Sequence, residues 1–123
     1  MEVKDFLQKW YETFAENVPS EIMERRVLSR GNLPWHIFTW GEVETKEQEE
    51  AFELLKTARF NKLIIYGHDI DDNHFVQIVN KMPNLWELTK LYRDVYITDT
   101  DFTWTFVLTH EDTLGPYFTT TKD

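Results

Sequence analysis

The spacing of apolar residues along the chain changes between a helical period and a strand period. Within residues 3–18, apolar side chains recur every three or four positions, which predicts an amphipathic helix with one wide apolar face. Ser20 follows Pro19 and is typical of an N-cap residue. A second helix is therefore predicted from there to about Arg30, with Gly31 suited to its C-terminal end.

The next segment begins with a helix-breaking residue and then returns to helical signals. Pro34 precedes a β-branched and aromatic run, which predicts a strand at about 35–40. Thr45 and Gln48 have the spacing of a capping box, in which a threonine and a glutamine satisfy backbone N–H groups at a helix start. A third helix is therefore predicted over about 46–59.

Two strands and a short helix are predicted beyond residue 60. The continuous apolar run "KLIIYG" (62–67) is typical of a central strand that is buried on both faces, and "HFVQIV" (74–79) of another strand. Asn84 and Glu87 form a second possible capping box, which predicts a helix after Pro83.

In the last third of the chain, apolar residues recur at every second position, which is the period of a β-strand. The runs 94–98 and 101–110 flank the polar turn "TDTD", which predicts a hairpin whose second strand has one core face. The segment 115–123 is expected to be a loop and a tail. Together these elements predict an α+β fold, with helices packed on one face of a mixed or antiparallel sheet and a C-terminal β-hairpin.

Composition adds limits on size and setting. A chain of 123 residues predicts a single domain over 1–123, and the apolar share of 41% and aromatic share of 15% are ample for a core. The chain has no cysteine, which excludes disulfides and thiolate metal sites and favours a reducing compartment. No signal-peptide or membrane-spanning pattern is found, so a cytoplasmic protein is expected.

Charge narrows the classes of partner. The 22 acidic and 13 basic residues give a net charge of −9, which would repel phosphate backbones and anionic membranes, so neither a nucleic acid nor a membrane is expected as a partner. Acidic residues concentrate in "GEVETKEQEEAFE" (41–53). This segment is either a solvated helix face or a docking surface for a basic protein.

Metal and cofactor signatures are weak. Asp69, Asp71 and Asn73 occupy the first three ligand positions of an EF-hand loop, but His74 stands where that loop requires glycine. The four histidines, His36, His68, His74 and His110, match no metal-ligand spacing. The four glycines are isolated, so no phosphate-binding loop is present and no cofactor or metal is expected.

General acid/base chemistry has one candidate. His110 and Glu111 end the last predicted strand, but neighbours on a strand point to opposite faces, so the two side chains are not expected to pair. His36 lies on the other predicted strand that carries a histidine among apolar residues. If the two strands were adjacent, His36 and His110 would line one cleft.

Three segments resemble a known family. "WHIF" (35–38), "DVYITDTDFTWTFVLTHE" (94–111) and "GPYF" (115–118) are similar to motifs of small bacterial proteins catalogued as a domain of unknown function, mostly from spore-forming Gram-positive species. The resemblance implies a cytoplasmic, single-domain protein and assigns no activity. The matching positions that carry distinctive chemistry are Trp35, His36, Trp104, His110, Glu111 and Tyr117.

The sequence thus leads to three hypotheses. The first is a non-enzymatic interaction domain, similar by analogy to immunity proteins, that holds a basic protein on its acidic surface or in an aromatic-lined cleft with Trp35, Trp104 and Tyr117. The alternative is a hydrolase-type enzyme with an acid/base site around His36, His110 and Glu111. The third is a homo-oligomer built on exposed aromatic residues.

Overall fold

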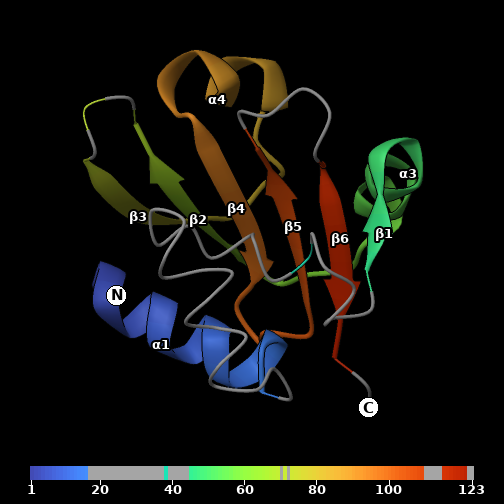
Figure 1. Cartoon of the computed structure of the whole chain (residues 1–123), viewed down its shortest axis with the longest axis horizontal. Coiled ribbons are helices and arrows are strands. Elements are labelled where there is room, and N and C mark those ends of the chain that lie inside the picture. The colour runs from blue at the N-terminus through green and yellow to red at the C-terminus, as the bar shows by residue number, and fades with distance from the viewer. Residues whose placement is uncertain (17–37, 39–44, 70, 72, 110–114, 122–123) are drawn as a thin grey trace.

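The computed structural model describes residues 1–16, 38, 45–69, 71, 73–109 and 115–121, and all structural statements below concern these residues (Figure 1). They form three helices and six strands. In chain order these are α1 (Val3–Phe14), β1 (Lys46–Glu47), α3 (Gln48–Thr57), β2 (Leu63–His68), β3 (His74–Val79), α4 (Leu85–Leu91), β4 (Asp94–Asp99), β5 (Trp104–Leu108) and β6 (Tyr117–Thr120).

The strands form one antiparallel sheet in the order β1-β6-β5-β4-β2-β3. The predicted α+β class is confirmed, and the sheet is antiparallel rather than mixed. The predicted hairpin of β4 and β5 is present, and β2 lies between β3 and β4 with every residue buried, as expected for a central strand.

Helices cover both faces of the sheet. On one face, Phe6 and Trp10 of α1 pack against Tyr66 and Tyr96 of the central strands. On the other face, α3 and α4 contribute buried Leu55 and Leu88 to a second core cluster. The expectation that the helices share one face is corrected: the residues of β2 and β4 are buried on both sides, which requires cover on both.

The side chain of Trp10 connects α1 to the middle of the sheet by a buried hydrogen bond. Its indole Nε1 donates a hydrogen bond of 3.0 Å to the hydroxyl of Thr105, and that hydroxyl shares a second one of 2.9 Å with Thr98. All three groups are buried. A buried donor or hydroxyl is costly unless it is paired, so this network specifies where α1 sits.

The predicted C-terminal loop is wrong over Tyr117–Thr120, which forms β6 and pairs with both β5 and β1. This run is short and follows Gly115 and Pro116, whose turn-forming character hid a strand of aromatic and β-branched residues. The sheet needs this strand, because β6 connects β1 to the hairpin.

The third helix begins two residues later than predicted. Lys46 and Glu47 form β1, and the hydroxyl of Thr45 donates to the carbonyl of Phe118 at 3.0 Å instead of capping the helix. A tertiary contact to β6 has therefore replaced the local capping box. For α4 the predicted cap is confirmed, since the side chain of Asn84 accepts from the backbone N–H of Glu87.

Asp99 builds the turn between β4 and β5. Its buried carboxylate accepts the backbone N–H groups of Thr103 and Trp104 and the hydroxyl of Thr103. Phe102 in this turn has a φ of 56°, outside the strand in which it was predicted. Its side chain still reaches the α1 face of the core, where its ring lies 5.9 Å from that of Phe6.

Gly67, near the end of β2, is required by a close contact with a side chain that packs on the sheet. A Cβ atom there would lie 2.5 Å from the ring of Tyr92, which follows α4 and lies across the glycine. The same ring lies 6.0 Å from that of Phe75, the β3 residue that pairs with Gly67. The end of α4 is thus held against the β2–β3 hairpin.

Two predicted elements fall outside the described residues. These are the helix at 20–30 and the strand at 35–40, except for Phe38, which lies in a 3₁₀ turn and packs edge-on against Trp10 with ring centroids 5.8 Å apart. Within the part of the chain that the structure covers, no helix has the length and apolar character needed to cross a membrane.

We expect Thr105→Val to lower the free energy of unfolding by about 1–3 kcal/mol, because the change keeps the shape but leaves the Trp10 indole and the Thr98 hydroxyl without a partner. Chemical denaturation of the wild type, Thr105→Val, Trp10→Phe and the double variant would measure this. The double variant should lose less than the sum of the single losses. Additive losses would show that the two residues do not interact.

Candidate functional site

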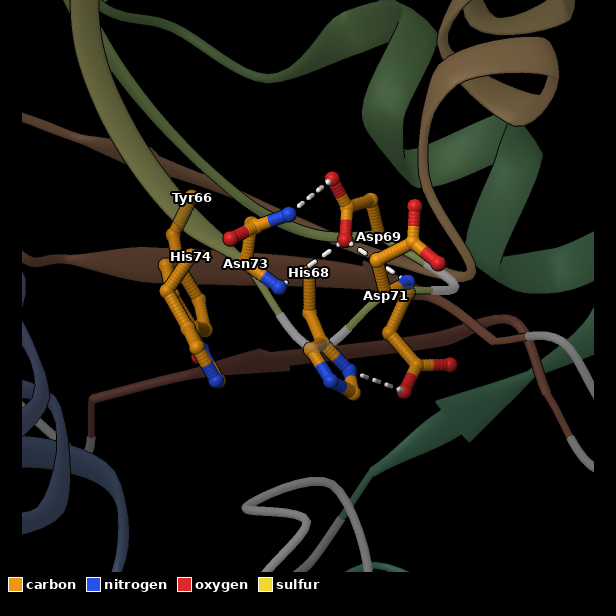
Figure 2. Close-up of polar contacts among 7 residues, drawn as sticks. Tyr66, His68, Asp69, Asp71, Asn73 and His74 are labelled. Carbon is orange, nitrogen blue, oxygen red and sulfur yellow. Dashed lines mark hydrogen bonds and ion pairs between the residues drawn. The ribbon is translucent and has the colours of Figure 1, made fainter.

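Three polar side chains form a row across three strands at one end of the sheet. His74 of β3 pairs with His68 of β2, and His68 pairs with Asp94 of β4. Directly opposed residues of antiparallel strands point to the same face. The row therefore lies on the face that α1 covers, next to Tyr66 (Figure 2). We name Tyr66, His68, His74 and Asp94 the His68 cluster.

The members of the His68 cluster are in mutual contact. Nδ1 of His68 lies 3.8 Å from Oδ2 of Asp94, and the rings of His68 and His74 stack with centroids 4.6 Å apart. The hydroxyl of Tyr66 and Nδ1 of His74 share a hydrogen bond of 2.5 Å. Burial changes along the row: the Asp94 side chain is 1% exposed and that of His68 11%, whereas His74 is exposed.

Tyr11 of α1 borders the same cluster. Burial raises its pKa far above the ordinary value, and the nearby hydroxyl of Tyr66 raises it further. Its hydroxyl oxygen is buried and makes no hydrogen bond within the part of the chain that the structure covers. Tyr11 therefore stays a neutral phenol and adds a second aromatic hydroxyl beside Tyr66.

The His68 cluster has the parts of an acid/base site. A buried carboxylate beside an imidazole can orient the ring and stabilise its protonated form. The separation of 3.8 Å is an ion-pair distance rather than a hydrogen bond. No group of three or more metal-ligating side chains occurs among the described residues.

The loop between β2 and β3 uses one of its acidic residues, Asp69, to hold a turn. The carboxylate of Asp69 accepts the backbone N–H groups of Asp71 and Asn73 at 2.9 and 2.8 Å, and the side-chain amide of Asn73 at 3.2 Å (Figure 2). Bonds to Asn73 lower the pKa of Asp69, because they stabilise the ionised carboxylate. This turn sets the register that brings His68 and His74 together.

The residues predicted for the acid/base site, His36, His110 and Glu111, lie outside the described residues, as does Trp35. They stay predictions. Trp104 and Tyr117, predicted to line a cleft, are both buried and belong to core clusters on opposite faces of the sheet. The indole of Trp104 donates to the carbonyl of Arg59 at 2.9 Å and stacks on Phe118.

His68 and His74 were predicted from the sequence neither to bind a metal nor to form an acid/base site, and no role was predicted for Asp94. A local signal did exist for the two histidines, because they flank a five-residue loop and a hairpin places the flanking residues opposite each other. No local signal identified Asp94, since its pairing with His68 joins segments 26 residues apart.

The two edges of the sheet differ in character. The β1 edge has two residues, both charged, and is followed directly by α3. The β3 edge is six residues long, carries no Asp, Glu, Lys or Arg, and pairs with β2 alone among the described strands (Figure 1). We name Phe75–Val79 the β3 edge segment. Its Phe75 and Ile78 are each 49% exposed.

Comparison with known proteins gives one match. A family model described as "Domain of unknown function (DUF4275)" matches residues 3–118, which is nearly the whole chain. No curated protein matches the chain, and no solved structure does.

We expect Asp94→Asn to lower the free energy of unfolding by about 1–3 kcal/mol, because it replaces the buried carboxylate beside His68 with a neutral amide and so removes the charge that the imidazole faces. Thermal and chemical unfolding would measure the loss. Asp71→Asn is the matched control: its exposed side chain should change stability by less than about 0.5 kcal/mol. Equal stability of the two variants would mean that the His68–Asp94 contact contributes nothing to folding.

A second prediction concerns pH. Burial, with a smaller effect of the Glu47 carboxylate, raises the pKa of Tyr117 from 10.0 to about 12. In the unfolded chain Tyr117 has the ordinary tyrosine pKa of 10.0, so the contribution of Tyr117 to stability is complete below pH 10.0 and declines as pH rises to about 12. In a pH titration followed by phenolate absorbance, Tyr117→Phe should lack one tyrosine that titrates at high pH in the wild type. Glu47→Gln should lower the pKa of Tyr117, so that this tyrosine titrates at a lower pH than in the wild type. A titration curve unchanged in both variants would contradict the assignment.

Proposed function

The chain belongs to the DUF4275 family, whose function is not assigned, and we propose that it is a non-enzymatic interaction domain that binds a basic protein. The binding surface is the β3 edge, to which the partner adds one extended segment. The single observation that carries the proposal is the long, uncharged and exposed β3 edge segment.

An edge strand offers backbone N–H and C=O groups that an extended peptide can pair with, which is a recurring mode of protein recognition. Side chains of the β3 edge segment alternate between the two faces. Phe75 meets Tyr92 on the face of α3 and α4, while Val76 packs beside the core cluster under α1. An added strand would find apolar neighbours on both of its sides.

Charge selects the class of partner. The net charge of −9 attracts basic proteins from a distance and repels acidic ones. Asp69 and Asp71 lie in the turn that leads into β3, so a basic residue flanking the added segment would have acidic side chains close by. The negative charge thus orients the basic partner and raises its rate of encounter, and the backbone of β3 forms the hydrogen bonds with the added segment.

The second candidate function is the hydrolase-type acid/base site, which was predicted around His36, His110 and Glu111. The observation that favours this class is the contact of the buried His68 with Asp94, because the exposed ring of His74 stacks on that of His68. Screening of chromogenic esters would test it: His68→Gln should abolish any hydrolysis while unfolding remains cooperative. Activity that survives this change would remove His68 from the chemistry.

The test of the interaction domain uses two variants with the same charge change. Ile78→Lys places a charge on the β3 edge, and Trp86→Lys places one at an exposed apolar site on α4. Immobilised full-length chain should capture basic proteins at low salt, and so should Trp86→Lys. We expect Ile78→Lys to retain less than about a tenth of this capture, because an edge charge blocks strand addition.

A salt series gives the second readout of the same experiment. Capture should weaken as salt screens the long-range attraction, on the scale of a Debye length of roughly 8–10 Å. Equal capture by Ile78→Lys and Trp86→Lys would exclude the β3 edge as the binding surface. No capture of basic proteins at low salt by the wild type would remove the proposed function.

A further inference from the structure

We infer that in the absence of its partner the chain pairs β3 with β3 of a second copy, in an antiparallel arrangement about a two-fold axis. This inference rests on the proposed function and deepens it. The same edge that receives the partner is then occupied by a second copy, and the partner gains access by displacing it.

The first argument is the chemistry of the β3 edge segment. Its five residues, Phe75 to Val79, include no proline, no glycine and no charge, and two of its four apolar side chains, those of Phe75 and Ile78, are half exposed. Natural proteins cover, shorten or charge such edges, because they template pairing with other chains. The β1 edge is shortened and charged in this way, and β3 is not. A second copy supplies the missing cover.

The second argument is geometric. When two identical edge strands pair antiparallel, the two-fold axis is perpendicular to the sheet, so the same face of each copy stays on the same side. An axis at Val76 places this residue beside its counterpart on the α1 side. The same axis brings Phe75 of one copy opposite Gln77 of the other, on the side of α3 and α4. The exposed residues of each copy therefore meet side chains from the same strand of the other.

The third argument is charge complementarity at the two ends of β3. The acidic turn with Asp69 and Asp71 precedes the strand, and Lys81 follows it. With a two-fold axis at Val76, the turn that contains Asp71 in one copy lies near the end of β3 that precedes Lys81 in the other. The arrangement therefore brings Asp71 of one copy into the neighbourhood of Lys81 of the other twice, once at each end of the interface.

These two residues cannot pair within one copy. The six residues of β3 lie between them, and a strand rises about 3.4 Å per residue, so β3 alone spans roughly 17 Å. That distance exceeds the Debye length of roughly 8–10 Å. Any energetic coupling between Asp71 and Lys81 is therefore a property of two copies, which makes the pair a specific probe.

The net charge of −9 on each copy opposes the association. The dimer is accordingly weak and dependent on concentration. A weak dimer suits regulation of the edge, because a basic partner attracted by the combined negative charge can replace the second copy.

Sedimentation velocity over a wide range of concentrations tests the inference on the full chain. The wild type and Trp86→Lys should shift from monomer to dimer as concentration rises, and Ile78→Lys should remain a monomer. Circular dichroism checks that each variant is folded. A wild type that is monomeric throughout, or an Ile78→Lys variant that dimerises like the wild type, would overturn the inference.

A charge exchange tests the two-fold arrangement with variants confined to exposed residues. Asp71→Lys and Lys81→Asp should each weaken the dimer several-fold, up to about tenfold, because each places like charges near each other at both ends. The double variant restores both pairs and should return the dimer dissociation constant to near the wild-type value. Failure of the double variant to recover would overturn the antiparallel pairing.

The two proposals fail in different ways. A monomeric chain that still loses capture of basic proteins on Ile78→Lys would remove self-pairing and keep the proposed function. A dimer that follows the charge exchange but captures no basic protein would remove the basic partner and establish self-pairing as the role of β3.

Discussion

The hydrogen bond from the Trp10 indole to Thr105 is the contact on which the arrangement of this protein depends. It joins the only described helix on one face to the centre of the sheet, through a buried hydroxyl that Thr98 shares. The rings of Tyr11 and Tyr96 pack edge-on against the same indole. Since Tyr11 borders the His68 cluster, the position of one buried donor also determines what surrounds that cluster.

The β2–β3 hairpin produces both features to which a function is attached. The carboxylate of Asp69 holds the turn, the turn sets the register, and the register opposes His68 to His74. In the same hairpin, successive side chains of the edge strand β3 point to alternate faces of the sheet. The candidate acid/base cluster and the candidate binding edge are thus two results of one local structure, on neighbouring strands.

Periodicity predicted the elements whose own residues decide their structure. The four-residue spacing of Phe6, Trp10 and Phe14 identified α1, and the apolar run of β2 identified a central strand. Long-range pairing decided the rest. β6 is a strand because β5 and β1 flank it, and Thr45 contacts the carbonyl of Phe118 in place of its own helix. The contact of His68 with Asp94 arises from the pairing of β2 with β4, which no local pattern encodes.

The contrast between the two sheet edges has a consequence for the size of any assembly. A sheet can grow through many molecules by edge pairing only if each molecule has two edge strands that can pair with a neighbour. Among the described strands, β1 has two residues with a charge at each, and the other edge strand, β3, is six residues long and carries no Asp, Glu, Lys or Arg. Self-pairing through β3, as proposed above, would use the one long edge of each molecule, so such an assembly would stop at two copies and would not extend to a fibre.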